Sequence, residues 1–338
     1  MPTTQTAAAV REQPAQHGNA KLSVMLRTVV YLADDICSFE FVCPHGRSLP
    51  AFSAGAHIDI HLPGGIIRQY SLCNDPAERH RYVVAVLRDP RGRGGSLAMH
   101  EQLHPGAIVT ISMPRNHFPL AAHASSYVFL AGGIGITPIM SMVAEARAAG
   151  KPFHLYYCTR TPQRTAFLRE LRPLVEAGVA LVHHDYGEVA AGLDLKRLLC
   201  DYPAGAHLYY CGPTGFLDAV EQAASGWPAQ AVHCERFCAP ASSCAADDPE
   251  GDAPFEVELA KSGKRLTVAA GQTIADALVA NGVEVDVSCR QGYCGTCMTR
   301  YLAGQPLHRD TVLDDEDRED FIMICCSRAR GQSLVLDL

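Results

Sequence analysis

The chain has 338 residues, of which 48% are hydrophobic and 19% charged, and its formal net charge is −7. This length exceeds what one ordinary hydrophobic core needs and predicts two or three domains. The acidic balance argues against nucleic acid as a partner, because such binding depends on neutralising phosphates with Lys and Arg. No apolar run reaches about 18 residues, so we expect no membrane span.

Residues 1–20 are polar and rich in Ala, and they lack the apolar core of an export signal. We therefore expect a disordered tail at this end. The sequence contains 14 Cys, which without an export signal are more typical of reduced thiols and metal ligands than of a disulfide framework. These features predict a cytoplasmic protein.

Residues 21–122 are expected to form the first domain. Short runs of strand-forming residues alternate there with turns rich in Pro, Gly and Asp, a pattern typical of a small antiparallel β-barrel. Examples of the expected strands are Leu22–Leu32, Ala56–Leu62, Tyr82–Leu87 and Ile108–Ser112.

Two motifs in this domain suit a flavin phosphate. The first is Arg68-Gln-Tyr-Ser-Leu and the second is Gly92-Arg-Gly-Gly-Ser. An Arg offers forked donors to phosphate oxygens, and glycines expose backbone amides. The ring of Tyr70 is suited to stack on a flavin. By chemistry alone an alternative stays open, in which Arg68 is a surface residue and the glycines form a hairpin turn.

Residues 123–238 have a different pattern, in which strands alternate with helical stretches. This alternation predicts a parallel sheet with helices on both faces. The expected elements are the strands Tyr127–Ala131, Phe153–Cys158, Ala180–His184 and His207–Tyr210 and the helix Pro138–Ala149.

A glycine-rich turn, Gly132-Gly-Ile-Gly135, joins the first of these strands to the helix. Thr137 is expected as the N-cap and Pro138 as the first helical residue. Glycines at such a turn let a dinucleotide approach the backbone, and the helix N-terminus favours its pyrophosphate. The motif departs from G-x-G-x-x-G, and a plain tight turn is the alternative.

The second strand of this domain does not end in the Asp or Glu that would hold ribose hydroxyls. Arg160 follows it instead, with Arg164 close behind. Both cations suit the 2′-phosphate of NADPH, so NADPH stays open as an alternative to NADH.

Residues 239–253 are small, acidic and rich in Pro and Ser, and predict a linker. Residues 254–338 are expected to form a third domain, with strands at Phe255–Leu259 and Arg265–Val268 and a helix at Ile274–Ala280.

The strongest signal lies in this last domain. Cys289, Cys294 and Cys297 have the spacing C-x4-C-x2-C, and Cys325 follows at a distance. This is the spacing of the plant-type ferredoxin loop, whose four thiolates hold a [2Fe–2S] cluster. Gly292 and Gly295 let the backbone wrap a cluster and turn amides toward its sulfurs.

Other interpretations of the cysteines are a zinc site, a thioredoxin-like Cys294-x-x-Cys297 pair, and a separate metal site at Cys234, Cys238 and Cys244. The last has irregular spacing. Because Cys325 and Cys326 are adjacent, the residues alone do not decide which is the fourth ligand.

Taken together, the three segments resemble the phthalate dioxygenase reductase and vanillate demethylase reductase group of the ferredoxin–NADP reductase superfamily. The resemblance extends from about residue 21 to the C-terminus. The motifs occur in the same order, namely Arg68-x-Tyr-Ser-Leu-Cys-Asn, Gly92-Arg-Gly-Gly-Ser96, Gly132-Gly-Ile-Gly-Ile-Thr-Pro138, Cys211-Gly-Pro213, His233-x-Glu-x-Phe237, the cysteine loop and Cys325-x-Ser-Arg-Ala.

The resemblance implies an antiparallel flavin barrel, an α/β nucleotide domain and an α+β β-grasp ferredoxin domain. The flavin domain comes first, and in this group that order implies FMN rather than FAD. The residues implied to contact FMN are Arg68, Tyr70, Ser71, Ala85, Val86, Leu87, Gly94, Gly95, Ser96, Thr137 and Phe237. Those implied for the nucleotide are Thr137, Cys211, Gly212 and Pro213, which add to Gly133 and Gly135 of the glycine-rich turn and to Arg160.

The family motif also selects Cys325 as the fourth cluster ligand and leaves Cys326 as a buried thiol. NADH is the expected donor. The chain departs from the family pattern at Thr161, where relatives that use NADH tend to have an acidic residue.

The function implied is the reductase component of a Rieske-type aromatic oxygenase or demethylase, which passes electrons from NAD(P)H through FMN and the [2Fe–2S] cluster to the oxygenase. Such a relay needs positioning and no acid–base residue. We expect a monomer, and the acidic run 313–320 is a candidate partner surface or simply a solvated helix face. The alternatives are a free-standing diaphorase that reduces quinones or ferric compounds, and an iron–sulfur redox sensor.

Overall fold

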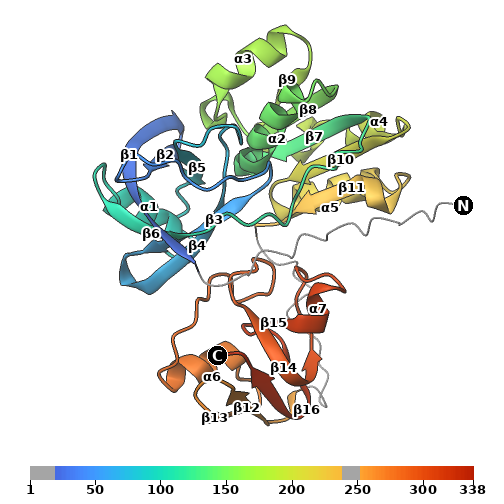
Figure 1. Ribbon diagram of the computed structural model, residues 1–338. Coiled ribbons are helices and arrows are strands. Elements are labelled where there is room, and N and C mark those ends of the chain that lie inside the picture. The colour runs from blue at the N-terminus through green and yellow to red at the C-terminus, as the bar shows by residue number, and fades with distance from the viewer. Residues whose placement is uncertain (1–19, 238–251) are drawn as a thin grey trace, which may run out of the picture.

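The computed structural model describes residues 20–237 and 252–338 (Figure 1). Within these residues, three β-sheets follow one another along the chain. Apart from Ala20, Asp252 and Ala253, the expected tail and linker lie outside the described residues. So do Cys238 and Cys244 of the alternative metal site.

The first sheet is antiparallel and has the strand order β4-β3-β6-β1-β2-β5. An antiparallel bridge between Leu72 and Val84 joins the two edges, and the Cys73 amide donates to the Val83 carbonyl at 2.9 Å. These contacts close the sheet, so the predicted antiparallel β-barrel is confirmed. The strands are β1 (Lys21–Ala33), β2 (Ile36–Val42), β3 (His57–Leu62), β4 (Ile66–Ser71), β5 (Tyr82–Leu87) and β6 (Ile108–Ser112).

One helix in the barrel was not expected from the sequence. The Gly92–Ser96 motif leads into α1 (Gly95–Gln102) rather than into a hairpin. The helix buries Ala98 and Met99 against the barrel core, but its eight residues carry too few apolar side chains for a helical period to be recognised. The short helix therefore depends on packing rather than on propensity.

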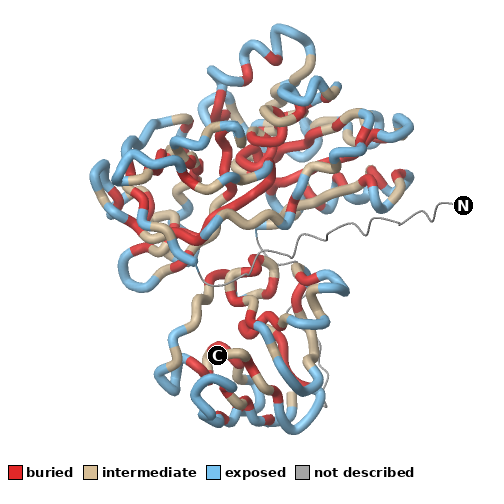
Figure 2. Tube along the Cα trace, in the orientation of Figure 1, coloured by how far each residue is buried: buried red, intermediate tan, exposed pale blue. Residues whose placement is uncertain are grey.

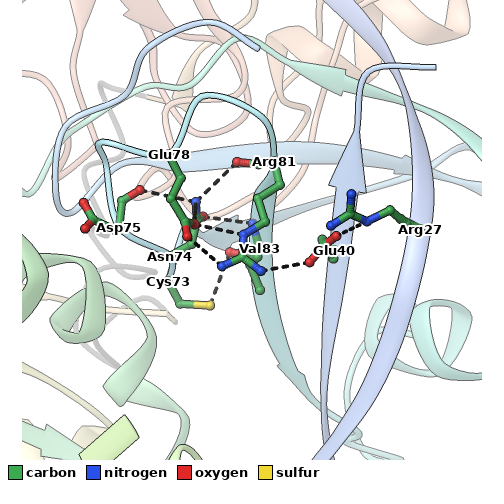
Figure 3. Close-up of polar contacts among 8 residues, drawn as sticks. All are labelled: Arg27, Glu40, Cys73, Asn74, Asp75, Glu78, Arg81 and Val83. Atoms are coloured by element: carbon green, nitrogen blue, oxygen red, sulfur yellow. Dashed lines mark hydrogen bonds and ion pairs between the residues drawn. The ribbon is translucent and has the colours of Figure 1, made fainter. Parts of the chain in front are cut away.

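A polar network fixes the loop that connects β4 to β5 (Figure 3). The Asn74 side chain accepts from the Val83 amide at 2.9 Å and donates to Glu78 Oε2 at 3.1 Å. Arg81 forms ion pairs with Glu78 at 2.7 Å and with Glu40 on β2 at 2.9 Å. The motif residue Asn74 therefore takes part in closing the barrel.

The second sheet is parallel throughout and has the order β11-β10-β7-β8-β9. Its strands are β7 (Ser126–Gly132), β8 (Phe153–Thr159), β9 (Ala180–His184), β10 (Ala206–Cys211) and β11 (Val232–Glu235). Its helices are α2 (Ile136–Ala148), α3 (Leu168–Glu176), α4 (Leu195–Leu199) and α5 (Thr214–Ala223). Short 3₁₀ turns lie at Pro63–Gly65, Gly133–Gly135, Pro162–Arg164, Val189–Ala191 and Ala229–Ala231.

Alternate residues of this sheet enter two different apolar clusters. Phe129 and Tyr157 pack with α2 and α3 on one face, and Leu130 and Leu208 pack with α5 on the other. The predicted parallel sheet with helices on both faces is confirmed.

The expected start of α2 is wrong. The helix begins at Ile136 with Gly135 as its N-cap, so Thr137 and Pro138 lie within its first turn. Thr137 Oγ1 donates to the Ile134 carbonyl at 3.1 Å instead of capping the helix. The 3₁₀ turn that precedes α2 already starts the coil, which moves the boundary toward the N-terminus.

The third sheet is mixed and has the order β13-β12-β16-β14-β15. Its strands are β12 (Phe255–Leu259), β13 (Arg265–Val268), β14 (Met298–Leu307), β15 (Phe321–Met323) and β16 (Arg328–Leu336), with helices α6 (Ile274–Ala280) and α7 (Asp317–Asp320). Buried residues of α6 pack on the strands in one core, which is the expected α+β β-grasp arrangement.

Buried residues lie inside two bodies, one formed by the barrel and the parallel sheet and the other by the third domain (Figure 2). One apolar cluster includes Ala85 and Phe118 of the barrel domain together with Phe129 and Tyr157 of the parallel sheet, so these two domains share a core. The cluster of the third domain contains residues of that domain alone. Among the residues described, no helix has the length and apolar character required to cross a bilayer.

We predict that Asn74→Ala lowers the free energy of unfolding by about 1–3 kcal/mol, because it leaves the partly buried Val83 amide without its acceptor. Thermal unfolding followed by circular dichroism measures the loss. Asp75→Asn is the control, since Asp75 is exposed and Asn keeps the acceptor for the Ala77 amide. Equal melting temperatures for Asn74→Ala and the control would contradict this role.

Candidate electron-transfer site

Arg68 on β4 packs tightly against the glycine motif. Gly94 has a φ of 79° and is the N-cap of α1. A Cβ on Gly95 would lie 2.3 Å from Arg68 Cγ, so only glycine fits there. The Arg68 guanidinium donates to the carbonyls of Ile67 at 2.7 Å and Arg93 at 2.5 Å.

The surroundings of Arg68 are cationic. Burial and the charge of Arg93 lower the pKa of Arg68. Across the described residues, no carboxylate lies within ion-pair distance of either guanidinium. The first amides of α1 lie beside this pair, and the arrangement fits a phosphate group. The Ser96 hydroxyl accepts from the Asp89 amide at 3.1 Å and donates to the Asp89 carbonyl at 3.3 Å, so it closes the loop.

The residues expected along the flavin ring lie on β4 and β5. Tyr70 is half-buried, with its pKa raised mainly by burial, and Ser71 is buried. Ala85 and Leu87 contact the core shared with the parallel sheet. Val86 points into the barrel core, so only its backbone is available to a ligand.

Ser71, Cys211 and Glu235 meet where β4 approaches the carboxyl edge of the parallel sheet. Ser71 Oγ donates to Glu235 Oε2 at 3.3 Å, and Cys211 is paired in register with Glu235. Burial raises the pKa of Glu235 to about 8. Burial, followed by the charge of Glu235, raises the pKa of Cys211 well above its ordinary value. Burial thus favours the uncharged forms of Cys211 and Glu235 beside Ser71.

Sequence reasoning did not select Glu235. Glu235 stands in the motif His233-x-Glu-x-Phe237, but only Phe237 of that motif was predicted as a site residue. Its role depends on contact with Ser71, 164 positions earlier in the chain, which no local pattern shows.

The glycines after β7 chiefly allow the turn before α2 to contact the end of β10. A Cβ on Gly135 would lie 2.2 Å from the Cys211 carbonyl oxygen, and one on Gly212 would lie 3.0 Å from Gly132 Cα. Gly133, with a φ of 55°, has open space at its Cβ position. The turn thus leaves open space beside Gly133, while Gly135 packs on the chain.

The remaining nucleotide candidates surround this edge of the sheet. Pro213 is the N-cap of α5, directly after Cys211 and Gly212. Arg160 is exposed after β8. Arg164 forms an ion pair with Asp35 of the barrel domain at 3.1 Å, so its charge is partly neutralised. Phe237 is 39% exposed at the end of the described segment.

The four cysteines of the ferredoxin motif are all buried, with exposed fractions of 2–3%. They form two pairs. Contact with Cys289, together with burial, raises the pKa of Cys294. Contact with Cys325 does the same for Cys297. Two thiol pairs suit the two irons of a [2Fe–2S] cluster.

A single-ion site is a different arrangement, and the described part of the chain contains no group of three or more His, Cys, Asp or Glu placed to hold one. Cys326 packs behind the loop, where a Cβ on Gly292 would lie 2.6 Å from its sulfur. Cys325 therefore remains the residue paired with Cys297.

The cysteine loop contacts the other two domains directly, which sequence reasoning did not foresee. Its side chains and carbonyls make several hydrogen bonds across the domain boundary. These are Ser288 Oγ to the Ile67 carbonyl at 3.0 Å, Gln69 Nε2 to the Cys294 carbonyl at 2.8 Å, Thr296 Oγ1 to Asp59 Oδ1 at 3.1 Å, Tyr293 Oη to the Phe237 carbonyl at 2.8 Å, and Arg93 to the Cys289 carbonyl.

Comparison with known proteins gives matches over most of the chain. Residues 257–330 match a family described as "2Fe-2S iron-sulfur cluster binding domain". Residues 111–232 match "Dimethylamine monooxygenase subunit DmmA-like, N-terminal domain".

Two curated relatives are similar along nearly their whole length. The "Vanillate O-demethylase oxidoreductase" of Pseudomonas putida is 47% identical over 90% of this chain and 96% of its own. The "Tert-butanol monooxygenase / tert-amyl alcohol desaturase reductase subunit" of Aquincola tertiaricarbonis is 46% identical, covering 94% of this chain and 96% of its own.

A solved structure of phthalate dioxygenase reductase, described as "a modular structure for electron transfer from pyridine nucleotides to [2Fe-2S]", aligns with a TM-score of 0.70. It is 41% identical, and the alignment covers 94% of this chain and 98% of that one.

We predict that stability falls as the pH rises from about 5 to about 8, because Glu235 keeps its proton in the folded state but loses it near its ordinary pKa of 4.5 when unfolded. The decline contributed by this group should be on the order of a few kcal/mol at most. Glu235→Gln keeps an uncharged side chain and should flatten the decline. Melting temperatures of both proteins across this pH range test it, and parallel curves would contradict it.

Proposed function

Because the chain belongs to the phthalate dioxygenase reductase and vanillate O-demethylase reductase family, we propose that it carries electrons from NADH through FMN and a [2Fe–2S] cluster to a Rieske-type aromatic oxygenase. One observation carries the proposal. The loop with the candidate cluster ligands lies against the same barrel motifs that hold the candidate phosphate site, through Gln69 and Arg93.

The cofactors supply the redox chemistry when bound, since a nicotinamide gives two electrons as hydride, a flavin handles two or one, and the cluster accepts one. The chain's own residues bind and orient. In the proposal, Arg68 and the α1 amides hold the FMN phosphate. Ser71, Cys211 and Glu235 receive the nicotinamide ring as uncharged partners.

The cluster ligands we propose are Cys289 and Cys294 for one iron and Cys297 and Cys325 for the other. Their burial excludes water from the thiolates. Proton transfer is not part of this relay, so we assign no acid–base residue.

We propose NADH rather than NADPH as the physiological donor. Arg164 is one of the two cations near the end of β8, and its ion pair with Asp35 reduces its attraction for a 2′-phosphate. The Asp34 amide also donates to the Gln163 carbonyl at 2.8 Å and fixes this segment on the barrel.

For the oxygenase we propose a docking surface on the acidic segment 314–320. Asp314, Asp315, Glu316, Glu319 and Asp320 are exposed, and the segment includes α7. β15 follows directly and leads to Cys325. A basic partner surface that docks here would meet the acidic charge of a segment that leads through β15 to a cluster ligand.

Thiolate ligands and a supply of reduced nucleotide both favour the cytoplasm as the site of action. We propose that the protein works there as a monomer.

The test begins with protein purified anaerobically, whose visible spectrum is recorded before and after NADH or NADPH is added. The proposal predicts flavin and iron–sulfur absorbance that both bleach, faster with NADH. The oxidised Rieske centre of an oxygenase component is then offered as acceptor, with a benzoquinone as the comparison. Rapid quinone reduction without transfer to any Rieske centre would favour the diaphorase. Bleaching of the flavin alone would remove the cluster from the relay.

The partner surface has its own prediction. Changing the five exposed acids of 314–320 to Asn and Gln should raise the apparent KM for the oxygenase several-fold at low salt and have little effect at high salt, because exposed charges are screened. Reduction of the benzoquinone serves as the control and should not change. An unaltered KM at low salt would contradict this surface.

A further inference from the structure

The barrel residues that reach the cysteine loop belong to the flavin motifs themselves. Gln69 lies between Arg68 and Tyr70, and its Nε2 donates to the Cys294 carbonyl at 2.8 Å. Arg93 directly precedes Gly94, and its guanidinium donates to the Cys289 carbonyl. Each motif proposed to bind FMN thus also holds the backbone of a cysteine proposed to bind iron.

Flavin binding and contact with the cysteine loop fall to different residues of β4, because side chains alternate along a strand. Side chains of neighbouring strand residues point to opposite faces. Tyr70 packs against the barrel core together with Ile58 and Ile60 of β3. Gln69 therefore lies on the outer face, where its register partner on β3 is Asp59.

Asp59 extends this outer surface. Its carboxylate is 3% exposed; one oxygen accepts from Thr296 at 3.1 Å and the other from Arg115 at 2.6 Å. The ion pair holds the carboxylate in place. The cross-strand pair Gln69 and Asp59 thus contacts residues 294 and 296 of the loop, on either side of Gly295.

The hydrogen bonds given above between the described residues reach the carbonyls of one of the two thiol pairs. Arg93 and Gln69 hold Cys289 and Cys294, whereas Cys297 and Cys325 pack within the apolar core of their own domain. The barrel consequently fixes the half of the cluster site that faces it. Arg68, Gln69 and Tyr70 all lie on the short strand β4, so the proposed flavin ligands are neighbours in sequence of the residue that contacts this half of the cluster site.

We propose that Gln69 is a positioning residue that sets the distance between flavin and cluster, and so the rate of the one-electron step between them, without affecting hydride transfer to the flavin. This inference rests on the proposed function. Electron tunnelling falls steeply with distance, so a loop held by a main-chain hydrogen bond transfers faster than one that drifts from the barrel. The electron leaves the reduced flavin and enters the oxidised cluster, so no other reactant is needed.

The test uses the holoprotein in anaerobic stopped flow with NADH, in which flavin and cluster absorbance are followed separately. Gln69→Leu keeps the approximate size and removes the donor. It should slow cluster reduction by about tenfold and leave the rate of flavin reduction unchanged. Gln69→Lys restores a donor of similar reach and should recover most of the rate. Gln222→Ala, at an exposed position of α5, is the control for handling.

Two further measurements separate positioning from general damage. Iron content, flavin content and melting temperature of Gln69→Leu should match those of the unaltered protein. If hydride transfer limits the unaltered protein, flash photoreduction of the flavin isolates the second step. Thr296→Val removes the other contact and should slow the same step.

An unchanged flavin-to-cluster rate in Gln69→Leu would overturn the inference, and so would equal slowing of both steps. Failure of NADH to reduce the flavin in the unaltered protein would instead refute the proposed function, so the two failures are distinguishable.

Discussion

The loop of residues 288–296 lies against the outer face of the flavin barrel, and the proposed relay depends on this contact. A carrier of electron pairs and a carrier of single electrons cooperate only when they are close together. Here closeness comes from hydrogen bonds between two domains whose sheets are otherwise separate. Without them the cysteine motif and the flavin motifs would be complete sites with no fixed relation to each other.

The two domain boundaries are of different physical kinds. The barrel and the parallel sheet share one apolar cluster, which includes Ala85, Phe118 and Tyr157. Burial of such surface holds these two domains together as one unit. The third domain joins through polar contacts alone among those described above, and polar interfaces contribute less net free energy than apolar cores of similar extent. The two domains proposed to carry out hydride transfer are thus joined by the more stable of the two domain boundaries.

Much of this architecture follows from local sequence, because strand runs, turn residues and cysteine spacing are local signals. Four of the six barrel strands, the parallel sheet and the four-cysteine loop were predicted on that basis, whereas β2 and β4 were not named. The start of α2 was wrong by two residues, since a 3₁₀ turn preceded the helix. Helix α1 was missed because its apolar side chains are few.

What sequence could not supply was the relation between distant segments. Glu235 gains its role from Ser71, and Gln69 from a loop 225 positions later. Asn74 belongs to the family motif, yet its contacts place it in the closure of the barrel. A motif identifies residues that occur together, and only coordinates separate those that contact a ligand from those that support the chain.

The docking contacts have one more property, which is that many of their acceptors are main-chain carbonyls. Those of Ile67, Phe237, Cys289 and Cys294 are all of this kind. Every residue has a main-chain carbonyl, whatever its side chain. At these acceptors the hydrogen bond therefore depends on the path of the backbone and not on the identity of the accepting residue. The cysteine spacing already dictates that course. Gln69 and Arg93 therefore recognise the backbone of the loop, whereas Ser288, Tyr293 and Thr296 contribute their side chains. A ferredoxin domain exchanged onto this reductase body would need both the same loop path and these three donors.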